Sequence, residues 1–163
     1  MIHEVNGDLI TDLKYDIFCH QTNCMGVMGA GIAKQIAEAY PEVKRADQEY
    51  HRAIMDSTGA AEDMLGTIIT VKTHDNRLCV NMYGQVGFGW ARTCKTDYGA
   101  LRKCMEALEM KLSEYDESYI VGFPYGIGCG LGGGDWKVVR SIIERFSKNI
   151  RQDVYIVRKV EAK

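Results

Sequence analysis

The sequence predicts an α/β protein in which helices cover both faces of a mixed β-sheet. Short apolar runs rich in β-branched residues alternate with amphipathic helical patterns along the whole chain. Two of these runs, 67–73 and 78–83, are joined by a turn at Asp75-Asn76 and have the pattern of a hairpin, so the sheet is not purely parallel. A length of 163 residues suits one domain, and we predict that residues 1–163 form it.

Each predicted strand is a short run of apolar or β-branched residues bounded by polar or turn residues. The run at 17–19 follows a polar stretch, and the run at 119–123 is apolar apart from Gly122, which is typical of a strand buried on both faces. The predicted strands cover residues 1–5, 17–19, 67–73, 78–83, 119–123 and 154–157.

The helical segments carry apolar residues at spacings of three and four. Pro41 interrupts the first pattern, and a second helix follows and ends near Gly59. Asp135 stands where the N-cap of the last helix is expected. The predicted helices cover residues 32–40, 43–56, 101–112 and 136–147.

Composition and charge exclude several classes of protein. Apolar residues make up 46% of the chain and charged residues 26%, as in soluble globular proteins. A net charge of −2 argues against a nucleic-acid-binding surface over the whole molecule, which would be basic. Neither a membrane-spanning stretch nor a signal peptide is recognisable, so we predict a cytoplasmic protein that does not engage a membrane.

The six cysteines include no C-x-x-C pair, and we interpret them as reduced thiols. Cys19, His20 and Cys24 are close in sequence, but Cys19 and His20 should point to opposite faces of a strand. A fourth ligand is not evident. The sequence therefore predicts no metal and no cofactor.

Glycines cluster in two loops, each between a predicted strand and a predicted helix. The start of a helix offers unpaired N–H donors, and glycine lets that backbone approach an anion closely. Two such loops could hold a diphosphate from opposite sides; the alternative is that the glycines only make tight turns. Neither the dinucleotide-binding fingerprint nor the Walker A motif fits their positions. The first loop contains Gly26, Gly29 and Gly31; the second contains Gly126, Gly128, Gly130, Gly132, Gly133 and Gly134.

Four segments together resemble the macrodomain family. They are NGDLI at 6–10, HQTNCMGVMGAGIA at 20–33, NMYGQ at 81–85 and PYGIGCGLGGGDW at 124–136. With the helices between them they cover essentially the whole chain. The pattern is most similar to the branch that holds the ADP-ribose-1″-phosphate phosphatases and the terminal ADP-ribose protein glycohydrolase. The resemblance implies a three-layer α/β/α sandwich that binds ADP-ribose in a cleft at the strand ends.

The resemblance also assigns roles to individual residues. Asp8 would accept a hydrogen bond from the adenine amino group, with Leu9 and Ile10 supplying neighbouring backbone; the alternative for Asp8 is an ordinary turn residue. Asn23 would hold a hydroxyl of the distal ribose, or else form an Asx turn. The remaining implied ligand-binding residues are Gly26, Met28, Gly29, Gly31 and Ile32 on one side and Tyr83, Gly128, Cys129, Gly130, Leu131 and Gly132 on the other.

The sequence departs from the catalytic patterns of related macrodomains. The glycohydrolase of this branch uses a lysine just after the central strand and an acidic residue in the second loop. Here the strand end reads Tyr83-Gly84-Gln85 with no lysine after it until Lys95, and Gly132 stands at the acidic place, three residues before Asp135. The aspartate that deacetylase-like members carry beside the first glycine loop is also missing. His20 matches a histidine of the yeast-type phosphatase and is our candidate general base. Its alternative is a hydrogen-bonded histidine within the sheet.

We therefore predict a protein that binds ADP-ribose and hydrolyses a derivative of it without a metal. The substrates considered are ADP-ribose 1″-phosphate and ADP-ribosyl adducts on protein or nucleic acid, with His20, Asn23 and Gln85 as the catalytic candidates. Nucleic acid would be a partner only as such a modified substrate. Two alternatives remain: a reader that holds mono-ADP-ribose without turnover, and a nucleotide-binding regulator or antitoxin partner. The oligomeric state stays open.

Overall fold

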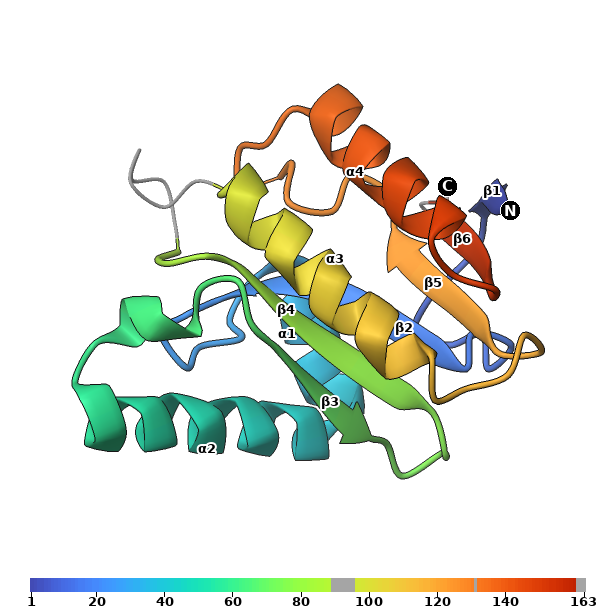
Figure 1. Ribbon diagram of the computed structural model, residues 1–163. Helices are drawn as coiled ribbons and strands as arrows, with labels where there is room; N and C mark the ends of the chain where they lie inside the picture. The colour runs from blue at the N-terminus through green and yellow to red at the C-terminus, as the bar shows by residue number, and fades with distance from the viewer. Residues whose placement is uncertain (89–95, 131, 161–163) are drawn as a thin grey trace.

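The computed structural model describes residues 1–88, 96–130 and 132–160. Its centre is a six-stranded sheet in the order β1-β6-β5-β2-β4-β3 (Figure 1). All neighbouring strands are parallel except β3 and β4, which form the predicted hairpin. The strands are β1 (Ile2–Asn6), β2 (Ile17–Asn23), β3 (Ile68–Lys72), β4 (Leu78–Gln85), β5 (Ile120–Pro124) and β6 (Asp153–Arg158).

Helices cover both faces of this sheet, as predicted. Figure 1 shows α3 and α4 on one side of the sheet and α1 and α2 on the other. The helices are α1 (Gly31–Ala39), α2 (Pro41–Thr58), α3 (Tyr98–Leu112) and α4 (Trp136–Lys148), and a short 3-10 turn, η1 (Ala61–Met64), follows α2. The three-layer α/β/α sandwich is confirmed.

Each face of the sheet has its own apolar core. On one face Leu101 and Leu108 of α3 pack with Ile143 of α4 against the sheet, and all three are fully buried. On the other face Ile36 of α1 and Val43 of α2 cover the sheet and are also fully buried. Because strand residues alternate between the two faces, neighbouring side chains of β2 belong to different cores.

Two strands run further than the sequence indicates, and this moves the start of the first glycine loop. β2 continues through polar residues to Asn23 instead of ending at residue 19, because β4 pairs with it along that stretch. β4 likewise continues to Gln85. At the helix starts, Pro41 is the first residue of α2, and Asp97 caps α3 by accepting a hydrogen bond from the amide of Ala100.

Within the described ranges, no helix is both long and apolar enough to cross a membrane.

Candidate functional site

A cleft opens at the carboxyl ends of the strands, where open α/β sheets bind their ligands. It consists of a larger cavity of about 450 Å³ and a smaller one of about 180 Å³. The two cavities lie side by side, since Ile32, Pro124 and Tyr125 line both. The larger cavity extends to Gln85 at the end of β4, and the smaller one reaches Asp8 after β1.

One wall of the larger cavity is the first glycine loop and the start of α1. Gly29, Ala30 and Gly31 line it, together with Ile32 and Ala33 of the first helical turn. Gly31 has a φ of 58°, a left-handed conformation that favours glycine. No side chain caps this helix, so its first amides are left to other acceptors. The positive end of the helix dipole therefore faces the cavity.

The opposite wall is the second glycine loop, with Gly126, Gly128, Gly130 and Gly132 lining the cavity. Gly126 and Gly128 have φ values of 75° and 74°, so the loop depends on glycine at both positions. The amide of Cys129 donates to the carbonyl of Gly126 at 2.9 Å, and the amide of Gly134 to that of Gly128 at 2.8 Å. These turns fold the loop into a ridge of nearly bare backbone beside the cavity.

At the other end of the cleft, Asp8 lies in the smaller cavity. Its Oδ1 accepts hydrogen bonds from the amides of Ile10 at 2.9 Å and Thr11 at 3.2 Å. Lys159 Nζ lies 3.6 Å from its Oδ2. Partial burial raises the pKa of Asp8, but the two amides and the ammonium group outweigh it, so the pKa falls below its ordinary value. Asp8 is thus a carboxylate with acceptor capacity left on the cleft side.

The deep end of the larger cavity carries amide side chains. Asn23 lines it and also forms the Asx turn considered above: its Oδ1 accepts from the amide of Met25 at 2.9 Å, and its Nδ2 donates to the carbonyl of Val27 at 2.9 Å. Gln85 lines it too and donates from Nε2 to the carbonyl of Gly87 at 2.7 Å. Each amide keeps one further N–H for a ligand or water.

His20, the predicted base, lies outside the cavity lining. Its side chain is fully buried, and Nε2 lies 2.6 Å from Asn81 Oδ1 on β4. Burial lowers the pKa of the imidazole to about 4, although the contacts with Asn81 and the backbone of Gln21 act in the opposite direction. Because side chains alternate along β2, His20 lies on the same face as Phe18, which packs in the core beside α1 and α2. This is the hydrogen-bonded histidine of the alternative interpretation, and it has no direct path to a bound substrate.

Four other predicted ligand residues also stand away from the cavity lining. Tyr83 is fully buried and donates to Asp47 Oδ1 at 2.7 Å. Gly26 packs against the ring of His51, and Met28 is buried in the core beside α1. Cys129 Sγ turns back to the carbonyl of Ile127 at 3.4 Å. Leu131 lies outside the described residues, so its predicted role is not addressed.

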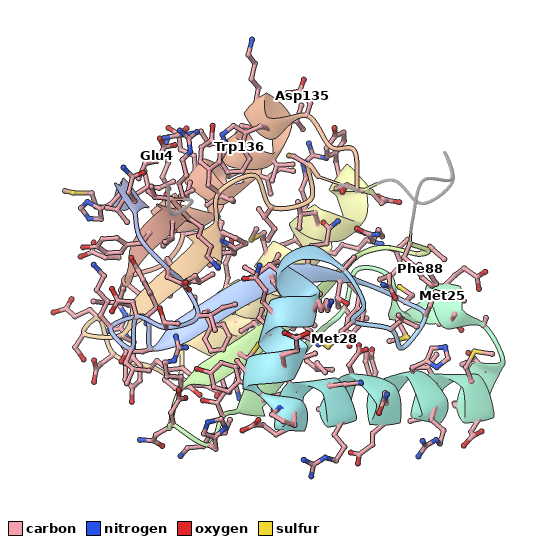
Figure 2. All side chains as sticks on the ribbon, turned by 180° about the vertical axis from the view of Figure 1, so that it is seen from behind. Glu4, Met25, Met28, Phe88, Asp135 and Trp136 are labelled. Carbon is pink, nitrogen blue, oxygen red and sulfur yellow. The ribbon has the colours of Figure 1, made fainter. Side chains whose placement is uncertain are left out.

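Several residues of the cleft were not singled out from the sequence. Val27 and Phe88 add apolar surface to the larger cavity, and Phe88 is 53% exposed. The ring of Tyr125 packs against that of Trp136 in a tilted arrangement, with ring centroids 4.7 Å apart. Figure 2 shows Trp136 near the top of the view, at the start of α4, and Phe88 to the right, close to Met25. Tyr125 directly follows β5, and residues at the carboxyl ends of strands often contact the ligand, so its position could have identified it.

Gln21 is the most informative of these residues. It lines the cavity, is 9% exposed and donates from Nε2 to Gln85 Oε1 at 2.9 Å and to Thr96 Oγ1 at 2.8 Å. The signal for it was alternation along β2, since Gln21 shares a strand face with Asn23.

The buried His20 should make the protein less stable in acid. Its pKa is about 4 in the folded chain against an ordinary 6.5, so the unfolded chain binds more protons between these values. Stability from this group is complete above pH 6.5 and is lost as the pH falls toward 4, by about 3 kcal/mol in all. Urea unfolding of wild type and His20→Gln at pH 7 and pH 4.5 measures it. A wild-type loss no larger than that of the variant would contradict the assignment.

Comparison with known proteins places this fold and cleft in a family. The family model described as Macro domain matches residues 19–143. The ADP-ribose 1″-phosphate phosphatase of Saccharomyces cerevisiae is 26% identical, over 93% of this chain and 96% of the relative. The macrodomain of Mycobacterium tuberculosis DarG superposes with a TM-score of 0.76 at 23% identity, covering 96% of this chain and 97% of that one.

A second solved structure, Thermosipho africanus DarTG in complex with ADP-ribose, superposes with a TM-score of 0.73 at 19% identity. The match covers 96% of this chain and 41% of that longer one. The family model spans more than half of the sequence, and the fold superposes on both solved structures over 96% of this chain. The chain belongs to the macrodomain family.

Proposed function

We propose that the protein binds ADP-ribose along the cleft. The adenine lies at Asp8, the diphosphate between the start of α1 and the second glycine loop, and the distal ribose at Asn23 and Gln85. The observation that carries this proposal is the pair of backbone walls that face each other across one cavity. Backbone N–H groups at a helix start and in a glycine turn suit a diphosphate. The relative solved with ADP-ribose supports the same ligand.

The size of the cleft is consistent with this ligand. Small-molecule sites have volumes of about 300–1,000 Å³, and the larger cavity alone has about 450 Å³. ADP-ribose has roughly 36 non-hydrogen atoms, which allows at most about −11 kcal/mol at about −0.3 kcal/mol per atom. A micromolar Kd needs only about −8 kcal/mol. Backbone donors, one carboxylate and apolar contacts are therefore enough.

We further propose that the protein hydrolyses ADP-ribose 1″-phosphate, a reaction for which the yeast relative is named. The free N–H group of Gln85 donates to one lone pair of a water oxygen, and the other lone pair attacks the phosphorus atom, while the free N–H group of Asn23 holds the distal ribose. The bond between phosphorus and the 1″ oxygen breaks, the proton of the water passes to the departing ADP-ribose, and phosphate is released. The amides of the second glycine loop stabilise the charge on the phosphoryl oxygens. His20 takes no direct part in this step because it is buried.

The second candidate function is a reader that binds ADP-ribose without turnover. It is favoured by one observation: no Asp, Glu, His, Lys or Arg is present among the described residues that line the larger cavity. For turnover of ADP-ribosyl adducts on protein or nucleic acid, the same deep end of the cavity would hold the reacting carbon.

The predicted cytoplasmic location also remains a proposal, and the five described cysteines, all free, are in keeping with it.

Calorimetry with ADP-ribose and an assay of phosphate release from ADP-ribose 1″-phosphate test these proposals. We expect saturable binding in the micromolar range and phosphate release by wild type. His20→Gln should release phosphate at a similar rate at pH 7.5, since removal of a true general base would cost about 100-fold or more. A loss of that size in a folded His20→Gln variant would show that His20 acts in the hydrolysis. Binding of ADP-ribose without release of product from any ADP-ribosyl substrate would favour the second candidate function, a reader without turnover.

A further inference from the structure

Thr96, which lies outside the second glycine loop, makes two hydrogen bonds to it. The hydroxyl of Thr96 donates to the carbonyl of Gly128 at 2.6 Å, and its amide donates to the carbonyl of Gly132 at 2.8 Å. The carbonyl of Gly128 also accepts from the amide of Gly134 at 2.8 Å, so both of its lone pairs are used. Thr96 therefore fixes two carbonyls of the loop whose amides we assign to the diphosphate.

Gln21 in turn fixes Thr96, and the direction of its hydrogen bonds is determined. The only hydroxyl hydrogen of Thr96 is used on Gly128, so its oxygen must accept from Gln21 Nε2. Gln85 donates to the carbonyl of Gly87, so its Oε1 accepts the other hydrogen of Gln21 Nε2. The carbonyls of Gly128 and Gly87, at the two ends of this chain of hydrogen bonds, thus set the orientation of the buried Gln21 amide.

This orientation leaves an unfavourable feature that the fold retains. Gln21 Oε1 is buried without a hydrogen-bond partner, which costs free energy. Two neighbouring positions are glycines because a side chain there would contact Gln21. A Cβ at Gly84 would collide with Gln21 Oε1, and one at Gly128 would lie 3.1 Å from it. The side chain of Gln21 thus occupies the space beside both glycines.

We propose that Gln21 is a positioning residue for diphosphate binding. Through Thr96 and Gln85 its amide holds the second glycine loop in the conformation that presents backbone N–H groups to the cavity. Gln21 links the first loop's strand, the end of β4 and the second loop, so the two walls of the cleft keep their spacing. This inference rests on the proposed function for the identity of the ligand, but the effect on the loop exists without a ligand.

Hydrogen exchange of the free protein, together with calorimetry, tests the proposal. Gln21→Met keeps the side-chain length and removes both donated hydrogen bonds. We expect amides of residues 126–134 to exchange about tenfold faster, while those of α3 do not change. The Kd for ADP-ribose should rise about tenfold, equivalent to about 1.4 kcal/mol. Gln21→Glu should have a larger effect, because a carboxylate would face two acceptor oxygens.

Two further variants make the test specific. Thr96→Val removes the hydroxyl but keeps the amide bond to Gly132, so it should accelerate the same loop even if Gln21→Met does not fold. Gln48→Met and Gln48→Glu, on the exposed surface of α2, are the matched controls and should change neither measurement. Unchanged loop exchange in both Gln21→Met and Thr96→Val would overturn the proposal. Faster loop exchange in a protein whose wild type does not bind ADP-ribose would support loop positioning and overturn the proposed function instead.

Discussion

Replacing Gly132 with alanine is expected to abolish measurable ADP-ribose binding at micromolar concentrations. A Cβ at this position would lie 2.7 Å from Thr96 Oγ1, 2.8 Å from the carbonyl oxygen of Gly128 and 3.0 Å from Gln85 Oε1. Two of these atoms are held in hydrogen bonds to each other, so neither can move without disturbing the loop. We expect the Kd to rise at least about 100-fold, or about 2.8 kcal/mol.

Gly130→Ala is the matched control for the conformation of the same loop. A Cβ at Gly130 meets no described atom of the protein within 4 Å, so this substitution leaves the conformation of the free loop unchanged. Hydrogen exchange of the free protein should therefore be faster in the loop for Gly132→Ala and unchanged for Gly130→Ala, and thermal melting should show both variants folded. Retained binding by Gly132→Ala would refute the role of this wall. Equal changes of loop exchange in the two variants would mean that the contact with Thr96 is not the cause.

Arg77→Met is expected to be the most destabilising single substitution outside the apolar cores. Arg77 is 4% exposed, and its guanidinium group donates to the carbonyls of Leu9 and Tyr15, each at 3.2 Å, and to the carbonyl of Ile10. It also lies 4.2 Å from the centroid of the Phe18 ring. Methionine fills part of the volume but leaves these carbonyls without donors. We expect a loss of about 3–5 kcal/mol in the free energy of unfolding.

Urea unfolding measures this loss, with Arg45→Met on the exposed surface of α2 as the control. The control should change the free energy of unfolding by less than about 0.5 kcal/mol. The segment that Arg77 holds follows Asp8, so a folded Arg77→Met protein should also bind ADP-ribose more weakly. A variant as stable as the control would show that the carbonyls of the segment find other donors.

Periodicity and glycine clustering were sufficient to predict the layers and the two walls of the cleft. They could not predict the chemistry at its deep end, because that depends on the register between β2 and β4. His20 and Gln21 are adjacent polar residues at the end of β2, yet one pairs with Asn81 inside the sheet layer and the other lines the cavity. Alternation shows that they face opposite ways, but only the packing of the helices shows which face is open.

Pairing with β4 also explains why β2 was predicted too short. Residues 20–23 are polar and therefore look like loop, but β4 pairs with them and buries them. The hydrogen bonds that their side chains make go partly to distant segments, as Gln21 does to Thr96, while Gln21 Oε1 stays without a partner. The same dependence on distant residues holds for Arg77, whose acceptors Leu9 and Tyr15 precede it by more than sixty residues.

The contact between the rings of Tyr125 and Trp136 gives the protein an intrinsic fluorescence signal for the cleft. Tyr125 lines both cavities, and its ring lies 4.7 Å from the indole, while Arg158 covers its ring at 3.7 Å. A nucleotide that shifts Tyr125 changes the polarity around the indole and hence its emission. With Trp90, the second tryptophan of the chain, replaced by phenylalanine, the intrinsic fluorescence of Trp136 would follow occupancy without any label.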